Sequence, residues 1–537
     1  MTQSAPAKGA AAGILNSSSV RVRFIVSILS NGSRAVLSFV SGMLVARVLK
    51  PSAYGDLAFL LGSFVAFQTL LDMGMSNAFF TLISQQPRPR KFYLTYFAWQ
   101  GLQFLVSASF VSLLCPSALL NVIWLGHSRG LVMLAFVAAF AQQQLWQAIS
   151  QIGEGARQSV RVQIMNLSIA LAHLTLVVAC IRFGCLSIPL VYWLMIIEYG
   201  AAILLSYWFL RQSNTGANEV PVASLSTMLK EYWVYCKPLA LLSVITFSYF
   251  FADRWLLQRF GGGAQQGFYQ VSAQFAGVAL LATTSILRIF WKEIAEANAR
   301  QDQARVERMH RKVFRGLVMV SASFSCFFIP WSGTIVVLLL GESYAKAGPV
   351  LAIMFLYPIL QTMGQVNGTT LLASGHTREY AAVSSIFLII SIPVTFLVQA
   401  PTNAAPIHGL GGGALGMAIK MVALGFLSIN AQAWILARKK QWSFEWAFPL
   451  VVIGITLALG YAARGIVALF WRMSSTTHLS QLQPFLGCLC LYAAGLLALI
   501  WNFPAVVGMK QSEVYQVVNV MLGRRTLIDS VHRQGGC

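Results

Sequence analysis

Charged side chains inside apolar runs are the residues of this chain whose types could do chemistry. The segment FSYFFADRWLLQRF, residues 247–260, carries Asp253, Arg254 and Arg259 within a long stretch of apolar residues. If this stretch spans a bilayer, each charge near its centre costs about 2.5 kcal/mol or more. Such charges are kept where they face a water-filled cavity or one another, so they mark candidate functional positions.

Four further ionisable residues lie inside other apolar runs, namely Arg34, Asp72, Glu198 and Lys420. Arg34 either lines a cavity or extends its charged head to the membrane interface. Asp72 either faces a cavity or braces a helix break beside Gly74. Glu198 is a candidate for proton or cation coupling. Lys420 follows a run of glycines that indicates close packing or a flexible helix start, and it is a candidate for the transport path.

Asp253 and Arg254 are adjacent, so on one helix their side chains point about 100° apart and need not pair with each other. We expect Arg254 to line a cavity, because lipid cannot solvate an ionisable side chain. Asp253 either pairs with a cation on another helix or faces water near the outer end of the span, and Arg259 is an interface residue. The acids Asp72, Glu198 and Asp253 are the candidates for ion coupling.

Amide side chains and a tryptophan gather in the segment AFAQQQLWQAISQ, residues 139–151. They could hydrogen-bond to sugars and stack on them, or they could join helices to one another. We assign Gln143 and Trp146 to the candidate cavity.

No motif for catalysis or metal binding is found. Most of the eight cysteines lie in or beside apolar runs, and Cys488 and Cys490 have no His or acidic residue nearby. This is not the spacing of a zinc site. The glycine-rich stretches FGGGAQQG and LGGGALG lack the lysine of a nucleotide-binding loop, and no nucleophile elbow occurs. The sequence predicts no metal, no cofactor and no enzymatic activity.

The composition indicates an integral membrane protein. Of the 537 residues, 57% are hydrophobic and 10% are charged, whereas ordinary globular chains carry about 25% charged residues. A soluble protein of this length needs a charged exterior that this composition cannot supply. The first twenty residues lack the apolar core and cleavage site of a signal peptide, so we expect an uncleaved, multi-spanning protein.

The chain is predicted to be all-α, because it holds fourteen stretches long enough to cross a bilayer, for which about 20 mostly apolar residues suffice. They leave no room for a large domain outside the membrane. The predicted spans are residues 24–48, 55–82, 92–115, 130–152, 161–182, 186–210, 237–260, 268–291, 312–340, 347–373, 379–400, 408–437, 446–470 and 484–505.

The distribution of Lys and Arg predicts the orientation. If the N-terminus is cytoplasmic, the loops on that side hold 26 of the 38 Lys and Arg residues, the opposite loops hold five, and seven lie within or at the ends of spans. Both termini are therefore expected in the cytoplasm. The net charge of +22 is explained by topology and contact with anionic headgroups of membrane lipids, so no nucleic-acid partner is expected.

The loose segment RQSNTGANEVPVASLS, residues 211–226, marks the predicted boundary between two lobes. The expected organisation is a cytoplasmic N-tail, an N-lobe of six spans, a cytoplasmic linker, a C-lobe of six spans, two additional spans and a cytoplasmic C-tail. Their residues are 1–23, 24–210, 211–236, 237–437, 438–505 and 506–537.

The two lobes share a pattern where their first spans end. VARVLKPSAYGDLAFL and LLQRFGGGAQQGFYQVSA each place an Arg, then a turn with Gly or Pro, then an aromatic residue beside a Gly. Two related halves of six spans with a path between them are common in secondary transporters.

Three groups of segments resemble bacterial polysaccharide exporters, the lipid-linked oligosaccharide flippases of the multidrug/oligosaccharidyl-lipid/polysaccharide (MOP) exporter superfamily. LVARVLKPSAYGDLAFL with LLDMGMSNAFFTLIS resembles their first two helices. DRWLLQRFGGGAQQGFYQVSAQF with RIFWKEIAEA resembles their seventh and eighth. LLLGESYAKAGPVLAIMFL with GQVNGTTLLASGHTREY is similar to the ninth to eleventh, so the resemblance extends over nearly the whole chain.

The resemblance implies two six-helix lobes that rock to open a central cavity to each side in turn, plus two C-terminal helices. It implies a flippase for polyprenyl-pyrophosphate-linked repeat units in a bacterial inner membrane, serving exopolysaccharide, capsule or O-antigen of lipopolysaccharide. Arg254, with Arg34 and Lys420, would then hold the pyrophosphate or an acidic sugar. Contacts with a polysaccharide polymerase and chain-length proteins are plausible.

Two other functions compete with this interpretation. A cation-coupled drug antiporter of the same superfamily would favour acidic cavity residues, whereas the charges inside the spans tilt towards Arg and Lys. A membrane polymerase, glycosyltransferase or ligase usually needs a sizeable outer loop, and every outer loop predicted here is short.

Overall fold

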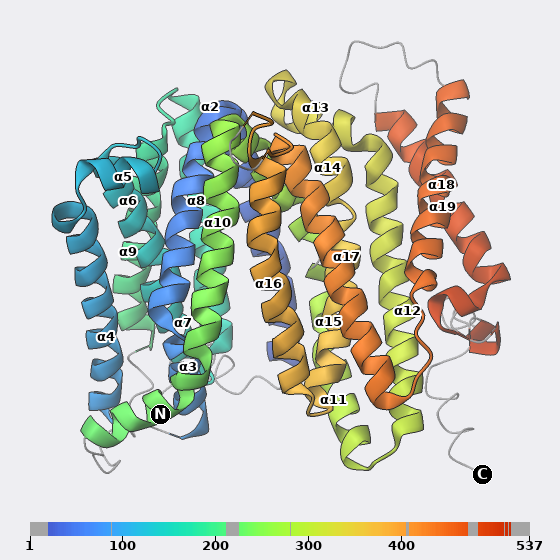
Figure 1. Ribbon diagram of the computed structural model, residues 1–537, viewed down its shortest axis with the longest axis horizontal. Helices are drawn as coiled ribbons and strands as arrows, with labels where there is room; N and C mark the ends of the chain where they lie inside the picture. The colour runs from blue at the N-terminus through green and yellow to red at the C-terminus, as the bar shows by residue number, and fades with distance from the viewer. Residues whose placement is uncertain are drawn as a thin grey trace, which may run out of the picture. The chain divides into compact units, whose positions relative to one another are not determined.

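The computed structural model describes residues 20–86, 88–210, 225–279, 281–403, 408–470, 482–509, 511–513 and 515–516. Within these residues the secondary structure is helical, with no strand, as the sequence predicts (Figure 1). Residues 1–19 of the predicted N-tail, residues 211–224 of the predicted linker and residues 517–537 of the predicted C-tail lie outside the described residues.

The described helices account for the predicted membrane spans. Twelve of them are long and apolar enough to cross a membrane. Two of the twelve, α2 (Val20–Asp72) and α10 (Leu225–Ala279), each join two helices across a kink, at Lys50 and Gly262. With each kinked helix counted as two, they match the fourteen predicted spans. The chain is therefore a multi-pass, all-α membrane protein.

The helices form two compact units. The first comprises Met1–Val271, Leu339–Tyr344 and Leu388–Met417, and the second comprises the remainder. Between α2 and α10, the first unit contains α3 (Met75–Gln85), α4 (Arg90–Ser109), α5 (Ser117–Ile123), α6 (Arg129–Phe140), α7 (Trp146–Gly155), α8 (Ser159–Arg182) and α9 (Ile188–Leu210).

Most of the later helices belong to the second unit, while α13, α16 and α17 are shared between the two units. They are α11 (Leu281–Ala299), α12 (Gln303–Phe328), α13 (Ser332–Leu340), α14 (Gly348–Met354), α15 (Tyr357–Ala373), α16 (Thr377–Gln399), α17 (Gly413–Lys440), α18 (Ala447–Phe470) and α19 (Leu482–Asn502). The predicted lobe boundaries stay a prediction.

The sequence pattern shared by the two halves corresponds to a shared break in the backbone. Each helix breaks three residues after the arginine of the pattern, at Lys50 after Arg47 and at Gly262 after Arg259. The backbone angles at the two breaks are nearly the same, with φ 63° and ψ 169° at Lys50 and φ 74° and ψ 176° at Gly262. Glycine adopts this conformation readily, whereas at Lys50 it is strained.

The two breaks contact each other through glycines. A Cβ added at Gly55 would lie 1.8 Å from the carbonyl oxygen of Gly263, and one added at Gly267 would lie 2.1 Å from that of Pro51. Gly263 and Pro51 are the residues that directly follow the kinks. Gly55 of the first half therefore lies against the break at Gly262, and Gly267 of the second half lies against the break at Lys50. Only a residue without a side chain can approach the backbone this closely.

Replacing either glycine should separate the two kinked helices. We expect Gly55→Ala and Gly267→Ala to lower the free energy of unfolding similarly, by about 1–3 kcal/mol, because a backbone atom blocks the new methyl group. The measurement is the melting temperature of the purified protein. Gly277→Ala is the control, since no heavy atom lies within 4 Å of its added Cβ. Wild-type behaviour of both variants would contradict the contact.

An aromatic cluster fixes α3 and α4 to the start of α10 in the first unit. The ring centroids of Phe79 and Tyr96 lie 3.9 Å apart, and those of Phe92 and Tyr232 lie 5.2 Å apart. Beside this cluster, Arg88 forms an ion pair of 2.9 Å with Glu231. α3 also packs against α7 (Figure 1), whose Ala148 is buried in the same cluster.

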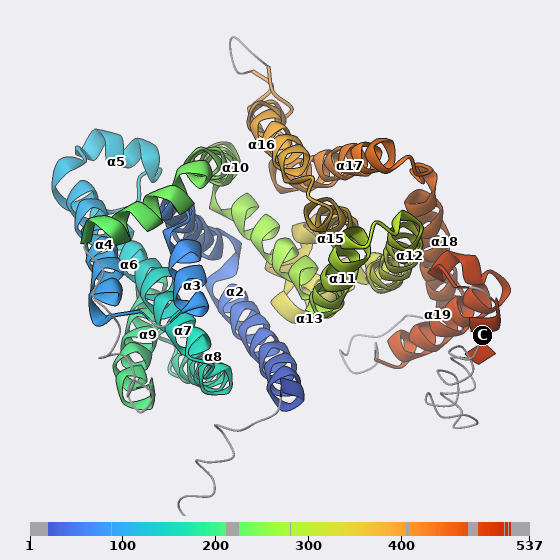
Figure 2. The same ribbon diagram turned by 90° about the horizontal axis from the view of Figure 1, so that it is seen from below.

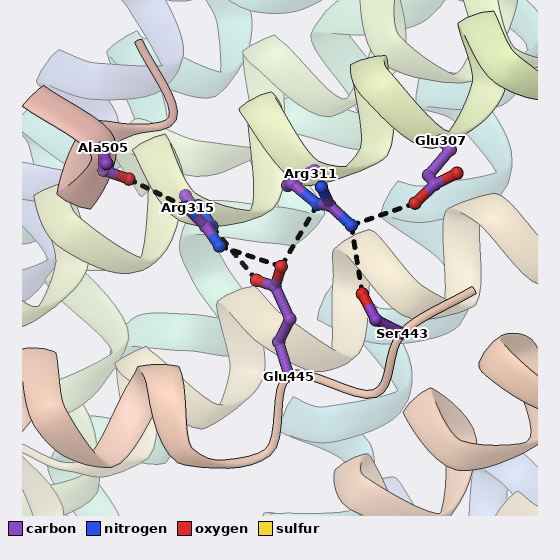
Figure 3. Close-up of polar contacts among 6 residues, drawn as sticks. All are labelled: Glu307, Arg311, Arg315, Ser443, Glu445 and Ala505. Atoms are coloured by element: carbon purple, nitrogen blue, oxygen red, sulfur yellow. Dashed lines mark hydrogen bonds and ion pairs between the residues drawn. The ribbon is translucent and has the colours of Figure 1, made fainter. Parts of the chain in front are cut away.

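In the second unit α12 is the central helix. It packs against α15 and α18, and α18 lies beside α19 (Figure 2). An ionic cluster joins α12 to the segment before α18 and to the turn after α19 (Figure 3). Arg315 donates two hydrogen bonds to Glu445, of 2.8 and 3.0 Å, and one of 3.1 Å to the carbonyl of Ala505. Arg311 contacts the same Glu445 at 3.1 Å.

Glu445 thus joins the segment before α18 to two arginines of α12. We expect Glu445→Gln to lower the free energy of unfolding by about 1–3 kcal/mol, because charge-assisted hydrogen bonds to both arginines are lost. The segment around it should also become more sensitive to protease. Glu307→Gln is the control, since that residue pairs with Arg311 from one turn away on the same helix and both side chains are exposed. Equal effects of the two variants would contradict a special role for Glu445.

Candidate functional site

A polar pocket of about 340 Å³ lies within the first unit, among helices that are otherwise apolar. Residues of α2, α3 and α10 line it, together with the start of α7 and the π-helical turn η2 (Ala141–Leu145) before it. Its polar lining residues are Gln68, Thr69, Asp72, Ser76, Asn77, Gln143, Gln144, Gln147, Ser243 and Thr246; Val65, Gly74, Leu239 and Leu242 complete it.

A helix break turns polar residues of α2 and α3 towards this pocket. Met73 and Gly74 have positive φ values of 46° and 87°, so α2 ends at Asp72 and α3 begins at Met75. Asp72 replaces lost backbone hydrogen bonds, because its carboxylate accepts from the backbone N–H of Ser76 at 3.0 Å and from the hydroxyl at 2.6 Å. Asp72 therefore braces the helix break and also lines the pocket.

The glutamines of η2 lie on an irregular, π-helical turn. A π-helical turn inserts an extra residue into a helix and is frequent at functional sites. Gln143 is exposed and lines the pocket, while Gln144 is buried at 5% exposure. The backbone carbonyl of Gln144 accepts a hydrogen bond of 3.4 Å from Gln100.

Two lining amides lack hydrogen-bond partners within the described residues. Neither amide atom of Gln68 has one, nor does the amide oxygen of Gln144. A buried polar group without a partner costs free energy. Such groups around a hollow are typical of a site that binds water or a polar ligand.

The sequence pattern does not single out most of these residues. Gln68, Ser243 and Thr246 are uncharged residues within apolar spans, and such residues often bond only to their own helix. Spacing gives a partial signal, because Thr69 and Asp72 lie three residues apart and so share one side of α2.

Among the predicted site residues, Asp72 and Gln143 lie together in the pocket. Trp146 is buried beside it without lining it, and its indole N–H donates to Asn166 at 2.9 Å, which joins α7 to α8. Arg34 is exposed on α2. Lys420, on α17, belongs to the second unit and is buried at 3% exposure. The roles of these side chains in transport stay predictions.

Arg254 and Asp253 lie further along α10 and are held by protein groups. Arg254 donates a hydrogen bond of 3.2 Å to the carbonyl of Ala58, and it lies against Gly62, where an added Cβ would come within 1.7 Å of the guanidinium. Asp253 is buried and accepts a hydrogen bond of 2.6 Å from Thr395 on α16.

Glu198 has a partner that the sequence interpretation missed. Its carboxylate is 4% exposed and lies 2.9 Å from Nδ1 of His173, so the pair joins α8 to α9. A signal for His173 was present, since it is a titratable residue in the middle of a predicted span.

A family model described as polysaccharide biosynthesis protein matches residues 21–290, half of the chain. The chain belongs to this family. The match includes every residue that lines the pocket. The predicted membership in a polysaccharide biosynthesis family is therefore confirmed. Among proteins with curated descriptions, none matches the chain.

Solved structures of the MOP superfamily share the fold of this family member. A structure of lipid II flippase MurJ in an inward closed conformation matches with a TM-score of 0.66 and 13% identity, over 89% of this chain and 99% of that chain. An inward-facing multidrug resistance MATE family transporter matches with a TM-score of 0.57 and 12% identity, over 76% and 96%. At these identities the likeness concerns the fold.

The pair of Glu198 and His173 gives a testable contribution to stability. We expect His173→Leu to lower the free energy of unfolding by about 1–3 kcal/mol, because it leaves a buried carboxylate without its partner. Adding Glu198→Gln should recover most of this loss, because an uncharged amide then replaces the buried carboxylate. Melting temperatures of the two single variants and the double variant give the coupling energy. Strictly additive effects would contradict a direct interaction.

Proposed function

We propose that this protein is a flippase that moves polyprenyl-pyrophosphate-linked oligosaccharide units across the bacterial inner membrane. It would work by alternating access and supply exopolysaccharide, capsule or O-antigen assembly. The observation that carries the proposal is the polar pocket inside the apolar helices of the first unit. Membership in the polysaccharide biosynthesis family supports it, as does the MOP-type fold.

The pocket suits the difficult part of this transport reaction. A glycan carries many hydroxyl groups, which cannot be left without hydrogen bonds in the bilayer core. Amides and hydroxyls such as those of Gln68, Gln143 and Ser243 can replace water around it. The polyprenyl tail needs no such replacement and stays in the lipid.

The pyrophosphate needs a separate cationic contact. We assign it to Arg254, with Arg34 and Lys420, as residues that act outside the pocket. Arg254 lies eight residues beyond Thr246 on α10, which is about 12 Å along a helix. That separation suits a ligand whose sugar and phosphate groups are bound by different parts of the protein.

We assign ion coupling to Glu198, Asp253 and Asp72. Glu198 is the strongest of the three, since it is buried inside the span and lies 2.9 Å from a second ionisable side chain, His173. We further propose that both termini lie in the cytoplasm. A polysaccharide polymerase and chain-length proteins are the proposed protein partners.

The second candidate function is a cation-coupled antiporter for small molecules. One observation favours it, namely that Asp72 is an acid within the pocket. An antiporter would recognise a cationic cargo directly through this acid, whereas a flippase would not require a positive charge on its glycan.

The proposal is tested in cells that lack this gene but keep the glycosyltransferases. We expect finished lipid-linked oligosaccharides to accumulate on the cytoplasmic face, and the wild-type gene to restore their export. Gln68→Leu should fail to restore it at equal expression, because the pocket then loses an amide. Gln163→Leu, at a buried glutamine of α8 outside the pocket lining, is the matched control and should restore it.

Two results would contradict this account in different ways. If no lipid-linked oligosaccharide accumulates in the deletion strain, the protein is not the flippase, and cation efflux becomes the next assay. If Gln68→Leu restores export as well as Gln163→Leu does, the pocket does not lie on the transport path.

A further inference from the structure

We propose that the pocket of the first unit takes sugar rings that carry hydroxyl and acetamido groups and rejects rings that carry a carboxylate, an inference that rests on the proposed function. It concerns the chemical class of the glycan, which the family membership leaves open. Three features of the lining carry it: its hydrogen-bonding groups, its charge and its apolar surface.

The hydrogen-bonding groups of the pocket match uncharged sugars. Five lining side chains are amides, and each offers both a donor and an acceptor. A sugar hydroxyl is also donor and acceptor at once, and an acetamido group carries one of each. Gln68 is the clearest case, because it is 7% exposed and neither of its amide atoms has a partner within the described residues.

The charge of the lining disfavours an acidic sugar. Within the described residues, no Lys or Arg lines the pocket, and Asp72 is its one acid. A carboxylate on the sugar would find no cation among these lining residues and would lie near this acid. Burial of an unpaired charge is far more costly than burial of a hydroxyl that finds hydrogen bonds.

Two arginines of the first unit are bonded to protein groups outside the pocket lining. Arg254 donates to the carbonyl of Ala58, and Arg88 forms its ion pair with Glu231. The cationic recognition expected for this transporter is assigned to the pyrophosphate, while the pocket binds the sugar.

The remaining surface suits the flat side of a pyranose ring. Val65, Leu239 and Leu242 line the pocket with aliphatic groups. A pyranose presents C–H groups on its faces and hydroxyls around its rim. A lining of aliphatic and amide groups can contact both the faces and the rim of the ring. Neither kind of group requires a charge on the sugar.

The test uses the full-length protein in lipid nanodiscs and two soluble disaccharides, N,N′-diacetylchitobiose and digalacturonic acid. Saturation-transfer NMR measures the affinity of each. We expect diacetylchitobiose to bind about tenfold more tightly or better than digalacturonic acid at neutral pH. Gln68→Leu should abolish this binding, whereas Gln163→Leu should leave it unchanged. Asp72→Asn should narrow the difference between the two sugars, because it removes the negative charge.

The inference is overturned if digalacturonic acid binds as tightly as diacetylchitobiose in a manner that Gln68→Leu abolishes. It is also overturned if Gln68→Leu leaves diacetylchitobiose binding intact, or if diacetylchitobiose does not bind. None of these results decides the flippase itself, because accumulation of lipid-linked oligosaccharides in the deletion strain is measured without reference to the disaccharides.

Discussion

Hydrogen bonding in surroundings that offer no water decides where the polar side chains of this protein lie. Several of those inside the spans join two helices, as Trp146 does with Asn166 and Glu198 does with His173. In the pocket of the first unit, neither amide atom of Gln68 has a hydrogen-bond partner within the described residues. Such amide atoms remain available to form hydrogen bonds with a polar ligand.

Backbone geometry builds this pocket as much as side chains do. The contact between the kinks at Lys50 and Gly262 holds α2 to α10, and a second break at Met73 and Gly74 turns Asp72 and Ser76 into the hollow. At each break a glycine or a strained residue adopts backbone angles that a regular helix does not allow, so the chain changes direction. The polar lining therefore depends on irregularities, while the apolar helices supply the frame.

The sequence predicted the frame well, because apolar stretches of sufficient length have few alternatives to a spanning helix. It also predicted the positions of the kinks in outline, through the repeated pattern of arginine, turn and glycine. It could not distinguish a polar residue that lines a pocket from one that joins two helices. Gln143 lines the pocket while Trp146 joins two helices, although they are three residues apart, and only the packing of α7 against its neighbours distinguishes them.

The most direct test of the central claim is reconstitution of the purified protein in liposomes that contain a labelled polyprenyl-pyrophosphate oligosaccharide. Access of a sugar-oxidising reagent from outside reports how much of the glycan changes leaflet with time. The account predicts that wild type and Gln163→Leu exchange the glycan between leaflets and that Gln68→Leu does not. Exchange no faster than in protein-free liposomes, under any ion gradient, would contradict it.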